Sequence, residues 1–368
     1  MNKAVMLRIF LGITFSLSVG ICNAQVQVQC MNNSEDAGKL NGAIQRSHVG
    51  EEIRIHGTCL VNETIVLLGD RTYEGDSRTG TIVRQAKDAN LPAVLASDSW
   101  ASNSAYTGAP IHIAHLTIDA NSADNSGTSA LVIRSWLTTI EDLLIENAPE
   151  DGIQITNLGR DNKTVLTTSQ VNGRISNCFV TNSGADGIHV VDSGNSVTDW
   201  NLLDSWIASS GKSAIDMENA AGWTVRGNHI YGVQQNAIYA NRCWATSIAS
   251  NYIEDFGGAG GNDTYYGISC TLNGGAASVI SQNRVFMFSK EPHSGKYVFI
   301  GVPGVNYKVG QVNVENNTIL GSGTAAETGL EFELNGGSGL NLLSSGNNVQ
   351  SVHTARMIGP GVRQVTEY

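Results

Sequence analysis

Residues 228–240 read Asn-His-Ile-Tyr-Gly-Val-Gln-Gln-Asn-Ala-Ile-Tyr-Ala, and the pattern of this segment recurs along the chain. Its first signal is Asn or Asp, then any residue, then a large apolar residue. Its second signal follows about ten residues later and is a small residue before alternating apolar ones. Alternation with a period of two over such short runs indicates β-strands rather than helices.

The first signal recurs at steps of 23 to 35 residues, as Asp142-Leu-Leu144, Asn177-Cys-Phe179, Asp204-Ser-Trp206, Asn228-His-Ile230, Asn251-Tyr-Ile253, Asn283-Arg-Val285, Asn317-Thr-Ile319 and Asn347-Asn-Val349. The second signal occurs as Gly152-Ile-Gln-Ile155, Gly187-Ile-His-Val190, Ala214-Ile-Asp-Met217, Ala237-Ile-Tyr-Ala240, Gly267-Ile-Ser-Cys270 and Gly329-Leu-Glu-Phe332. Because Asn tolerates the left-handed conformation, a stacked Asn would bend each coil in the same way. Persistent strand signals with loops of varying length predict a solenoid. An antiparallel sandwich would instead need hairpin turns every ~8–12 residues.

We therefore predict an all-β fold, a single-domain right-handed parallel β-helix over residues 25–368 with an N-terminal capping helix. The helix is expected from Ser34 to Arg46, with Ser34 as N-cap and acidic residues in the first turn. It would cover one open end of the solenoid, and Gly359-Pro-Gly361 would close the other. No Pro/Ser-rich linker divides the chain.

The first 24 residues are typical of a signal peptide. Lys3 and Arg8 precede a mostly apolar stretch, Ile9 to Ile21, and Cys22-Asn-Ala24 follows as a small-residue exit. The apolar run is too short to span a membrane comfortably. A lipid anchor on Cys22 is the alternative, and Ile21 disfavours it. We expect a secreted or periplasmic protein.

Composition and charge exclude several classes of protein. With 41 Gly, 6 Pro and 15% charged residues, the chain is neither a disordered acidic tail nor a coiled coil. Its net charge is −11, and because Lys3 and Arg8 leave with the signal, the mature chain has 20 basic against 33 acidic residues, or −13. This acidity argues against nucleic acid and against an anionic membrane surface as partners.

Five cysteines remain once Cys22 is removed, so at least one thiol is free. Cys30–Cys59 and Cys243–Cys270 are expected disulfides, and the second pair is separated by nearly one repeat. Cys178 lies in an apolar strand pattern and is expected to be packed rather than reactive. No Cys-x-x-Cys spacing indicates a zinc site.

The opening segments Gly50-Glu-Glu-Ile-Arg-Ile-His-Gly57 and Thr64-Ile-Val-Leu-Leu-Gly-Asp-Arg-Thr-Tyr73, with the repeats to about residue 350, resemble the pectate-lyase-like β-helix superfamily. This resemblance implies an extracellular enzyme that acts on polysaccharides. The signatures of pectate lyases and polygalacturonases are absent from the sequence, so the chemistry has to be argued from the site.

In each Gly-Ile-x-apolar strand the apolar residues face the core, and x and x+2 face outward. Stacked coils align these positions into two rows. The first row is Gln154, His189, Asp216, Tyr239, Ser269 and Glu331, and the second is Thr156, Val191, Glu218, Asn241, Thr271 and Glu333. In the superfamily this sheet usually floors the substrate groove.

Asp216 and Glu218 are the predicted catalytic pair, assisted by His189 and Tyr239. Two residues apart on one strand face, the acids have Cα atoms roughly 6.5–7 Å apart, near the ~6.5–9.5 Å between the carboxyl groups of inverting glycosidases. Mutual repulsion should separate their pKa values into those of an acid and a base. A solvated surface pair without function is the alternative.

Further residues are candidates for substrate binding: Lys212, Arg242 and Arg226 by charge, Trp223 and Trp244 as stacking platforms, and Asn241, Glu331 and Glu333 from the outward rows. Trp206 occupies an apolar slot and is expected in the core. No cofactor is required, although Ca²⁺ could bind Asp255 and Asp263 in the loop 255–266.

The favoured function is cleavage of an extracellular polysaccharide or oligosaccharide by a carboxylate pair, as in glycoside hydrolases or fructotransferases. A lyase that uses His189, Tyr239, Lys212 and Arg242 is the runner-up, and a non-catalytic glycan-binding solenoid is the third class. A net charge of −13 suits a neutral glycan better than a polyuronate. We expect a monomer or a trimer.

Overall fold

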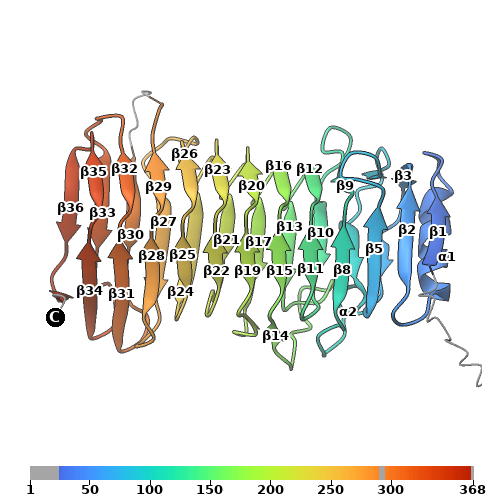
Figure 1. Ribbon diagram of the computed structural model, residues 1–368, viewed down its shortest axis with the longest axis horizontal. Coiled ribbons are helices and arrows are strands. Elements are labelled where there is room, and N and C mark those ends of the chain that lie inside the picture. The colour runs from blue at the N-terminus through green and yellow to red at the C-terminus, as the bar shows by residue number, and fades with distance from the viewer. Residues whose placement is uncertain (1–24, 290–294, 366–368) are drawn as a thin grey trace, which may run out of the picture.

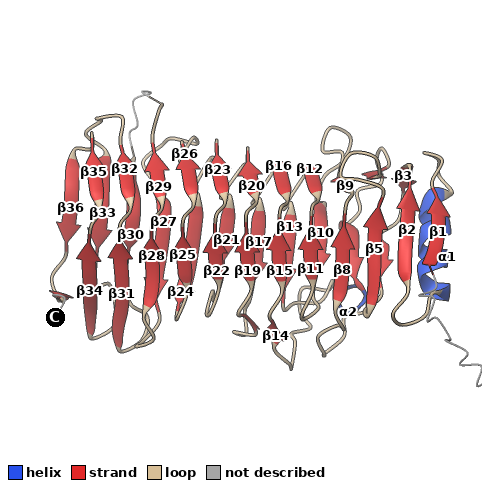
Figure 2. Cartoon of the chain, in the orientation of Figure 1, coloured by secondary structure: helices blue, strands red, loops and turns tan. Residues whose placement is uncertain are grey.

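The computed structural model describes residues 25–289 and 295–365, which form one elongated parallel β-helix (Figure 1). The predicted signal peptide lies outside the described residues. Three long sheets run along the solenoid, and strands that follow one another in each sheet come from successive coils. Figure 2 shows that helix is confined to the N-terminal part of the solenoid. The predicted all-β, single-domain fold is confirmed.

Sheet A contains β1 (Gln25–Gln29), β2 (Glu52–His56), β5 (Arg71–Gly75), β8 (Ile111–Ala114), β11 (Thr139–Glu141), β15 (Arg174–Ser176), β19 (Asn201–Leu203), β22 (Thr224–Arg226), β25 (Ser247–Ala249), β28 (Ser278–Ser281), β31 (Val309–Glu315), β34 (Gly339–Ser345) and β37 (Val362–Gln364). Sheet B contains β3 (Thr58–Val61), β6 (Ile82–Gln85), β9 (Thr117–Asp119), β12 (Leu144–Ala148), β16 (Phe179–Ser183), β20 (Trp206–Ala208), β23 (His229–Tyr231), β26 (Tyr252–Glu254), β29 (Arg284–Phe286), β32 (Thr318–Leu320) and β35 (Asn348–Gln350).

Sheet C contains β4 (Ile65–Leu67), β7 (Ala93–Ser97), β10 (Ser129–Ile133), β13 (Ile153–Thr156), β17 (Ile188–Val191), β21 (Ile215–Met217), β24 (Ile238–Cys243), β27 (Thr264–Leu272), β30 (Lys296–Val302), β33 (Glu327–Phe332) and β36 (Thr354–Ile358). A small sheet pairs β14 (Gln170–Val171) with β18 (Val197–Thr198), and a second short helix, α2 (Asp98–Ala101), follows β7. A complete coil runs from sheet C to sheet A to sheet B.

The core forms because every strand points its apolar residues inward, in register with the coils on either side. In sheet A one such column passes through Ile140, Ile175, Leu202, Val225, Ile248 and Ile280. All six side chains are fully buried. Burying each contributes on the order of 1.5–3 kcal/mol, so the repeated alternation is enough to determine the solenoid.

The recurrent Asn residues form a ladder at the turn from sheet A to sheet B. The Nδ2 of Asn228 donates to the Oδ1 of Asn251 at 3.0 Å, and the same bond links Asn251 to Asn283 and Asn283 to Asn317. The recurrent Asn residues were expected to take the left-handed backbone conformation, but those of the ladder do not. Asp142, Asn177 and Asp204 are left-handed, but in the ladder the residue before each Asn takes that conformation, for instance Gly227 and Gln282. The Asn side chain can then turn inward and satisfy buried backbone groups.

Helix α1 (Asp36–Arg46) covers the N-terminal end of the solenoid, as predicted, and buries Leu40 and Ile44 against the first coil. Its N-cap position is Glu35, one residue later than the expected Ser34. The carboxylate of Asp36 instead accepts backbone N–H bonds from Met31, Asn33 and Leu60. These hydrogen bonds attach the N-terminus of α1 to the first coil.

Both expected disulfides are present, Cys30–Cys59 and Cys243–Cys270, each linking adjacent coils. Cys178 is buried without a disulfide partner, and burial raises the pKa of its thiol to about 12. The predicted packing of Cys178 is therefore confirmed. Among the described residues, neither helix is long and apolar enough to cross a membrane.

Candidate active site on sheet C

The predicted outward row on sheet C is present in the structure. Gln154 pairs with His189, His189 with Asp216, and Asp216 with Tyr239 in successive coils. The row continues through Ser269 and Gly301 to Glu331. The strand alternation therefore places His189, Asp216 and Tyr239 side by side, as the sequence indicated.

His189 is held by two buried acids, Asp151 and Asp186, which are not among the predicted site residues. Its Nδ1 lies 2.9 Å from Oδ2 of Asp151, and Asp186 lies beside this pair. Burial alone would lower the pKa of His189, but the bond to Asp151 and the charges of Asp186 and Asp216 raise it to about 9. The imidazole is therefore a cation at neutral pH, and both its nitrogens are donors.

The backbone fixes the two acids. Asp186 N–H donates to Oδ1 of Asp151 at 3.2 Å, and Ser213 N–H donates to Oδ1 of Asp186 at 2.8 Å. A sequence signal for both acids was present. Asp151 and Asp186 each directly precede a Gly-Ile-x-apolar strand, whereas the next coil has Ser213 at that position. The position directly before Gly152 and Gly187 in these coils therefore also faces the site.

Asp216 is half-buried between His189 and Tyr239. Burial, followed by the negative charge of Asp186, raises the pKa of Asp216 to about 6, although the charge of His189 opposes this shift. The charge of Glu218 adds to the increase. Asp216 can therefore keep a proton in mildly acidic solution and release it to a substrate.

Asp151, Asp186, His189 and Asp216 form an acid–histidine cluster, and the remaining predicted residues lie around it. Glu218 is half-buried, and its Oε2 accepts the backbone N–H of Asp192 at 3.1 Å. Burial and the charge of Asp216 raise the pKa of Tyr239, which keeps its hydroxyl protonated. Lys212 is exposed at the turn before β21. Asn241 and Arg242 are half-buried on β24, and Nη1 of Arg242 is buried with no hydrogen-bond partner among the described residues.

Three residues of the cluster lie close enough to hold a cation. Nδ1 of His189 and one carboxylate oxygen each of Asp151 and Asp186 lie within 4.8 Å of one another. However, each carboxylate already accepts a backbone N–H, and Asp151 also binds the imidazole. A metal ion would have to replace the bond between His189 and Asp151.

A polar hollow of about 640 Å³ lies beside the cluster, at the turn from sheet B to sheet C. Its lining includes Ser126, Glu150, Asn182 and Gln234. Glu150 lines the hollow, and Asp151 directly after it holds His189. The hollow therefore adjoins the acid–histidine cluster.

Two predictions about tryptophans were wrong. Trp223 is fully buried and stacks on Trp200 with ring centroids 5.9 Å apart, so it cannot be a platform for a sugar. It directly precedes β22 and points into the solenoid. Trp206, expected in the core, is 42% exposed on the outer face of sheet B, because Ile207 takes the inward position. Trp244 is 47% exposed, as a platform requires.

The C-terminal part of the row is closed to solvent. Glu331 is only 2% exposed and forms an ion pair with Lys296. The ring of Tyr266 lies over Gly301, which is in the coil between those of Ser269 and Glu331. Glu331 therefore cannot contact a substrate directly, which corrects its predicted binding role. Glu333 is half-buried and accepts a hydrogen bond from Asn335 at 2.7 Å.

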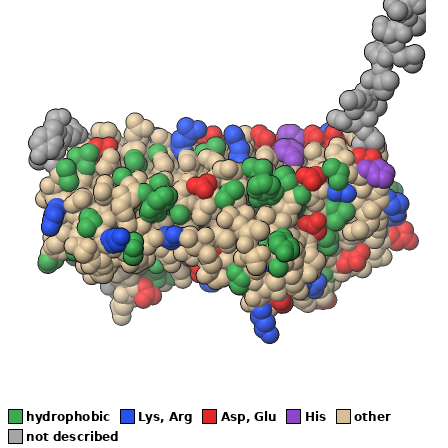
Figure 3. Space-filling model, turned by 90° about the horizontal axis from the view of Figure 1, so that it is seen from below, with side chains coloured by type: hydrophobic (Ala, Val, Ile, Leu, Met, Phe, Trp, Pro, Cys, Tyr) green, Lys and Arg blue, Asp and Glu red, His purple; other side chains and the backbone are tan. Residues whose placement is uncertain are grey.

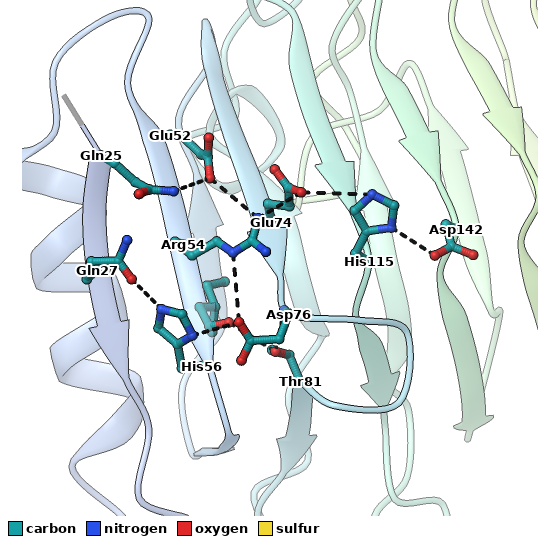
Figure 4. A network of polar contacts seen from close by, with 11 residues as sticks. Gln25, Gln27, Glu52, Arg54, His56, Glu74, Asp76, Thr81, His115 and Asp142 are labelled. Atoms are coloured by element: carbon teal, nitrogen blue, oxygen red, sulfur yellow. Dashed lines mark hydrogen bonds and ion pairs between the residues drawn. The ribbon is translucent and has the colours of Figure 1, made fainter. Parts of the chain in front are cut away.

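The basic residue Arg226 and a second polar cluster lie on other faces. Arg226 is on sheet A, away from sheet C. Figure 4 shows polar side chains over the first coils of sheet A, where Arg54 pairs with Glu74, His56 with Asp76 and His115 with Asp142, each at 2.8 Å. Because opposite charges pair throughout this cluster, we interpret it as a structural surface network.

Comparisons with known proteins agree with this architecture. A family model described as a right-handed beta helix region matches residues 164–355. No curated protein sequence matches the chain significantly.

Similar solved structures have little sequence identity. A tailspike of Escherichia coli bacteriophage HK620, solved with a hexasaccharide, has a TM-score of 0.67 and 12% identity over 92% of this chain and 65% of its own. PfbA, a surface adhesin of Streptococcus pneumoniae, has a TM-score of 0.58 and 14% identity over 92% of this chain and 94% of its own. The A-module of an Azotobacter vinelandii mannuronan C-5 epimerase has a TM-score of 0.50 and 12% identity over 92% and 97%.

The chain also spans 64% of the Dettilon tailspike, with a TM-score of 0.53 and 13% identity over 88% of this chain. It thus covers less than two thirds of the length of either tailspike. At these identities the likeness establishes the fold alone.

Proposed function

The chain belongs to the right-handed β-helix family, and from the acid–histidine cluster on sheet C we propose that it is a secreted enzyme that cleaves glycosidic bonds in a polysaccharide. The observation that carries this proposal is the half-buried carboxyl of Asp216, whose pKa of about 6 leaves it protonated in mildly acidic solution. The sugar-directed names of two similar solenoids, a tailspike solved with a hexasaccharide and a mannuronan epimerase, support the substrate class.

In the proposed reaction, Asp216 donates its proton to the glycosidic oxygen as the bond to the anomeric carbon breaks. Glu218, as a carboxylate, takes a proton from the water whose oxygen bonds to that carbon. Asp216 lies on β21 and Glu218 directly follows this strand, and a spacing of two residues fits the wider carboxylate separation of inverting enzymes. The imidazolium of His189 can donate a hydrogen bond through Nε2 and stabilise negative charge that develops beside it.

The charge states support β-elimination less well. A lyase needs a base that removes the proton next to a uronate carboxylate. His189 is held as a cation up to about pH 9, and the raised pKa of Tyr239 disfavours a phenolate. The negative net charge of the chain also suits a neutral glycan better than a polyuronate.

The test uses Asp216→Asn and Glu218→Gln in the mature protein, with a panel of neutral and uronic polysaccharides as substrates. We expect each variant to lose at least about two orders of magnitude in turnover, as is typical when a general acid or base is removed. New reducing ends are measured together with the ultraviolet absorbance of an unsaturated product.

Circular dichroism controls for folding, and Gln154→Ala, in the same row but without a titratable group, is the matched control variant. Full turnover in both acid variants would reject the pair. Unsaturated product from the wild type would establish a lyase instead.

A further inference from the structure

Exposed large apolar side chains gather along one edge of the solenoid, the turn from sheet C to sheet A. Six such residues lie at this turn: Tyr106, Trp136, Leu137, Val165, Trp244 and Tyr307. Figure 3 views the molecule from this side, on which β14 and α2 lie in Figure 1. Hydrophobic groups are scattered there among polar atoms rather than merged into one patch. Such spacing differs from the continuous apolar core of a stable protein–protein interface.

Three of these residues occupy one equivalent position of the turn. Trp136, Trp244 and Tyr307 each directly precede a non-glycine residue in the left-handed conformation, namely Leu137 (φ 50°), Ala245 (φ 53°) and Lys308 (φ 54°). This conformation is unfavourable for residues with a Cβ, most of all for a bulky one such as Leu. In the intervening coils Asn172, Asp199 and Gly222 take the same conformation, so it is a property of this turn, and the aromatic residue before it is what distinguishes these three coils.

The intervening coils carry smaller side chains at that position. Backbone bonds from Leu137 to Val171, from Asp199 to Ala221 and from Gly222 to Trp244 align the turns of successive coils. Between Trp136 and Trp244 the equivalent residues are thus Val171, Thr198 and Ala221. Four coil steps of ~4.8 Å therefore place the two tryptophans ~19 Å apart along this edge.

The two tryptophans differ from Trp206, which is equally exposed. Trp206 lies between Phe179 at 5.0 Å and His229 at 5.1 Å, with nearly parallel rings, so both of its faces are covered. Among the described residues, neither Trp136 nor Trp244 has a ring or cation contact. Lys308 lies 5.0 Å from the ring of Tyr307, which leaves that residue less suitable.

We propose that the edge from Trp136 to Trp244 is a binding rim for a polysaccharide chain, whose pyranose rings stack on the two indoles. Aromatic faces bind the C–H faces of sugars while the hydroxyls stay hydrated. Trp244 directly follows β24, the strand that carries Tyr239, so a chain held on the rim lies along one edge of the sheet that carries the cluster. The ligand class rests on the proposed function, whereas the rim geometry does not.

The test measures binding of Asp216→Asn protein, which should not degrade its ligand, to a printed array of neutral and uronic polysaccharides. Adding Trp136→Ala and Trp244→Ala together should reduce binding at least tenfold. Trp206→Ala, which removes an indole of similar exposure with covered faces, should leave binding unchanged. Retained binding in the double variant, or no binding of the parent protein to any polysaccharide, would overturn the proposal.

Two further measurements separate the outcomes. The otherwise wild-type Trp136→Ala/Trp244→Ala protein should lose at least tenfold more turnover on polymers than on short soluble oligosaccharides, which cannot span both indoles. If Asp216→Asn keeps its turnover, the catalytic assignment fails while the binding result stands. If the double variant changes the oligomeric state in light scattering, the rim is a protein interface and the glycan proposal is wrong.

Discussion

Asp216 experiences opposing influences that are set by single neighbours. Burial and the acids Asp186, Glu218 and Asp151 favour its neutral form, while the cation on His189 favours its charged form. Burial and the acids prevail, and the carboxyl can act as a proton donor. Asp151 and Asp186 also keep His189 protonated, so Asp216 and His189 divide the roles of neutral acid and fixed cation.

The pH dependence of turnover should report the proton on Asp216. Because the donor must be protonated, we expect kcat/KM to fall as the pH rises through about 6. The measurement is initial rates across a series of overlapping buffers. A rate that keeps rising to pH 8 would mean that Asp216 does not donate the proton.

Asp151 acts through His189 as a positioning residue. In Asp151→Asn the pKa of His189 should fall from about 9 toward its ordinary value, and turnover should drop by roughly ten- to a hundredfold, an effect typical of residues that orient a functional histidine. The pKa of His189 is measured by NMR titration of its ring protons.

Stability gives an independent readout of the same pair. His189 has a raised pKa in the folded state, so its contribution to the free energy of unfolding is complete below about pH 6.5, the unfolded value, and is lost as the pH rises through about 9. Asp151→Asn should remove this decline. An unchanged His189 titration in the variant would contradict the assignment.

At the scale of elements, the Asn ladder joins the coils more specifically than their apolar columns do. Asn283 donates from Nδ2 to Oδ1 of Asn317 and to the carbonyl of Ile248, and its Oδ1 accepts from Asn251. The side chain is fully buried. Removing it leaves donors and acceptors of two neighbouring coils without partners.

Asn283→Ala should therefore lower the free energy of unfolding by roughly 2–4 kcal/mol, since it leaves several buried polar groups unpaired. Chemical denaturation followed by circular dichroism measures the change. Asn313→Ala, at a half-buried position of β31, is the control and should change stability by less than about 0.5 kcal/mol. If the two substitutions lowered the free energy of unfolding equally, the Asn ladder would contribute no more to stability than an ordinary surface Asn.

At the scale of the whole molecule, the two ends of the solenoid are finished differently. Helix α1 covers the first coil, whereas the last coil has polar residues in its core columns. Arg356 pairs with Leu330, and Gln364 pairs with Leu342, although both partners point inward. An inward charge at an exposed strand edge discourages pairing with another chain.

Arg356→Leu should therefore promote end-to-end association, because it extends the apolar column to the open end. Analytical ultracentrifugation over a range of concentrations measures this association. Arg363→Leu, an outward position on the neighbouring β37, should cause much less of it. A monomeric Arg356→Leu protein would show that the charge does not protect this end.

The sequence by itself determined the solenoid, the outward row from His189 to Tyr239, the disulfide pairs and the capping helix. These follow from alternation and spacing, which act through neighbours in the chain or through identical positions in adjacent coils. How the remaining side chains meet in the site was decided by tertiary structure. Asp151 and Asp186 join His189 because the turn before sheet C folds their carboxylates over the strand, and Glu331 is closed off by Lys296 from another coil.

Likewise Trp223 and Trp206 exchange their expected places, because one residue of register at a turn reverses whether a side chain faces the core or solvent.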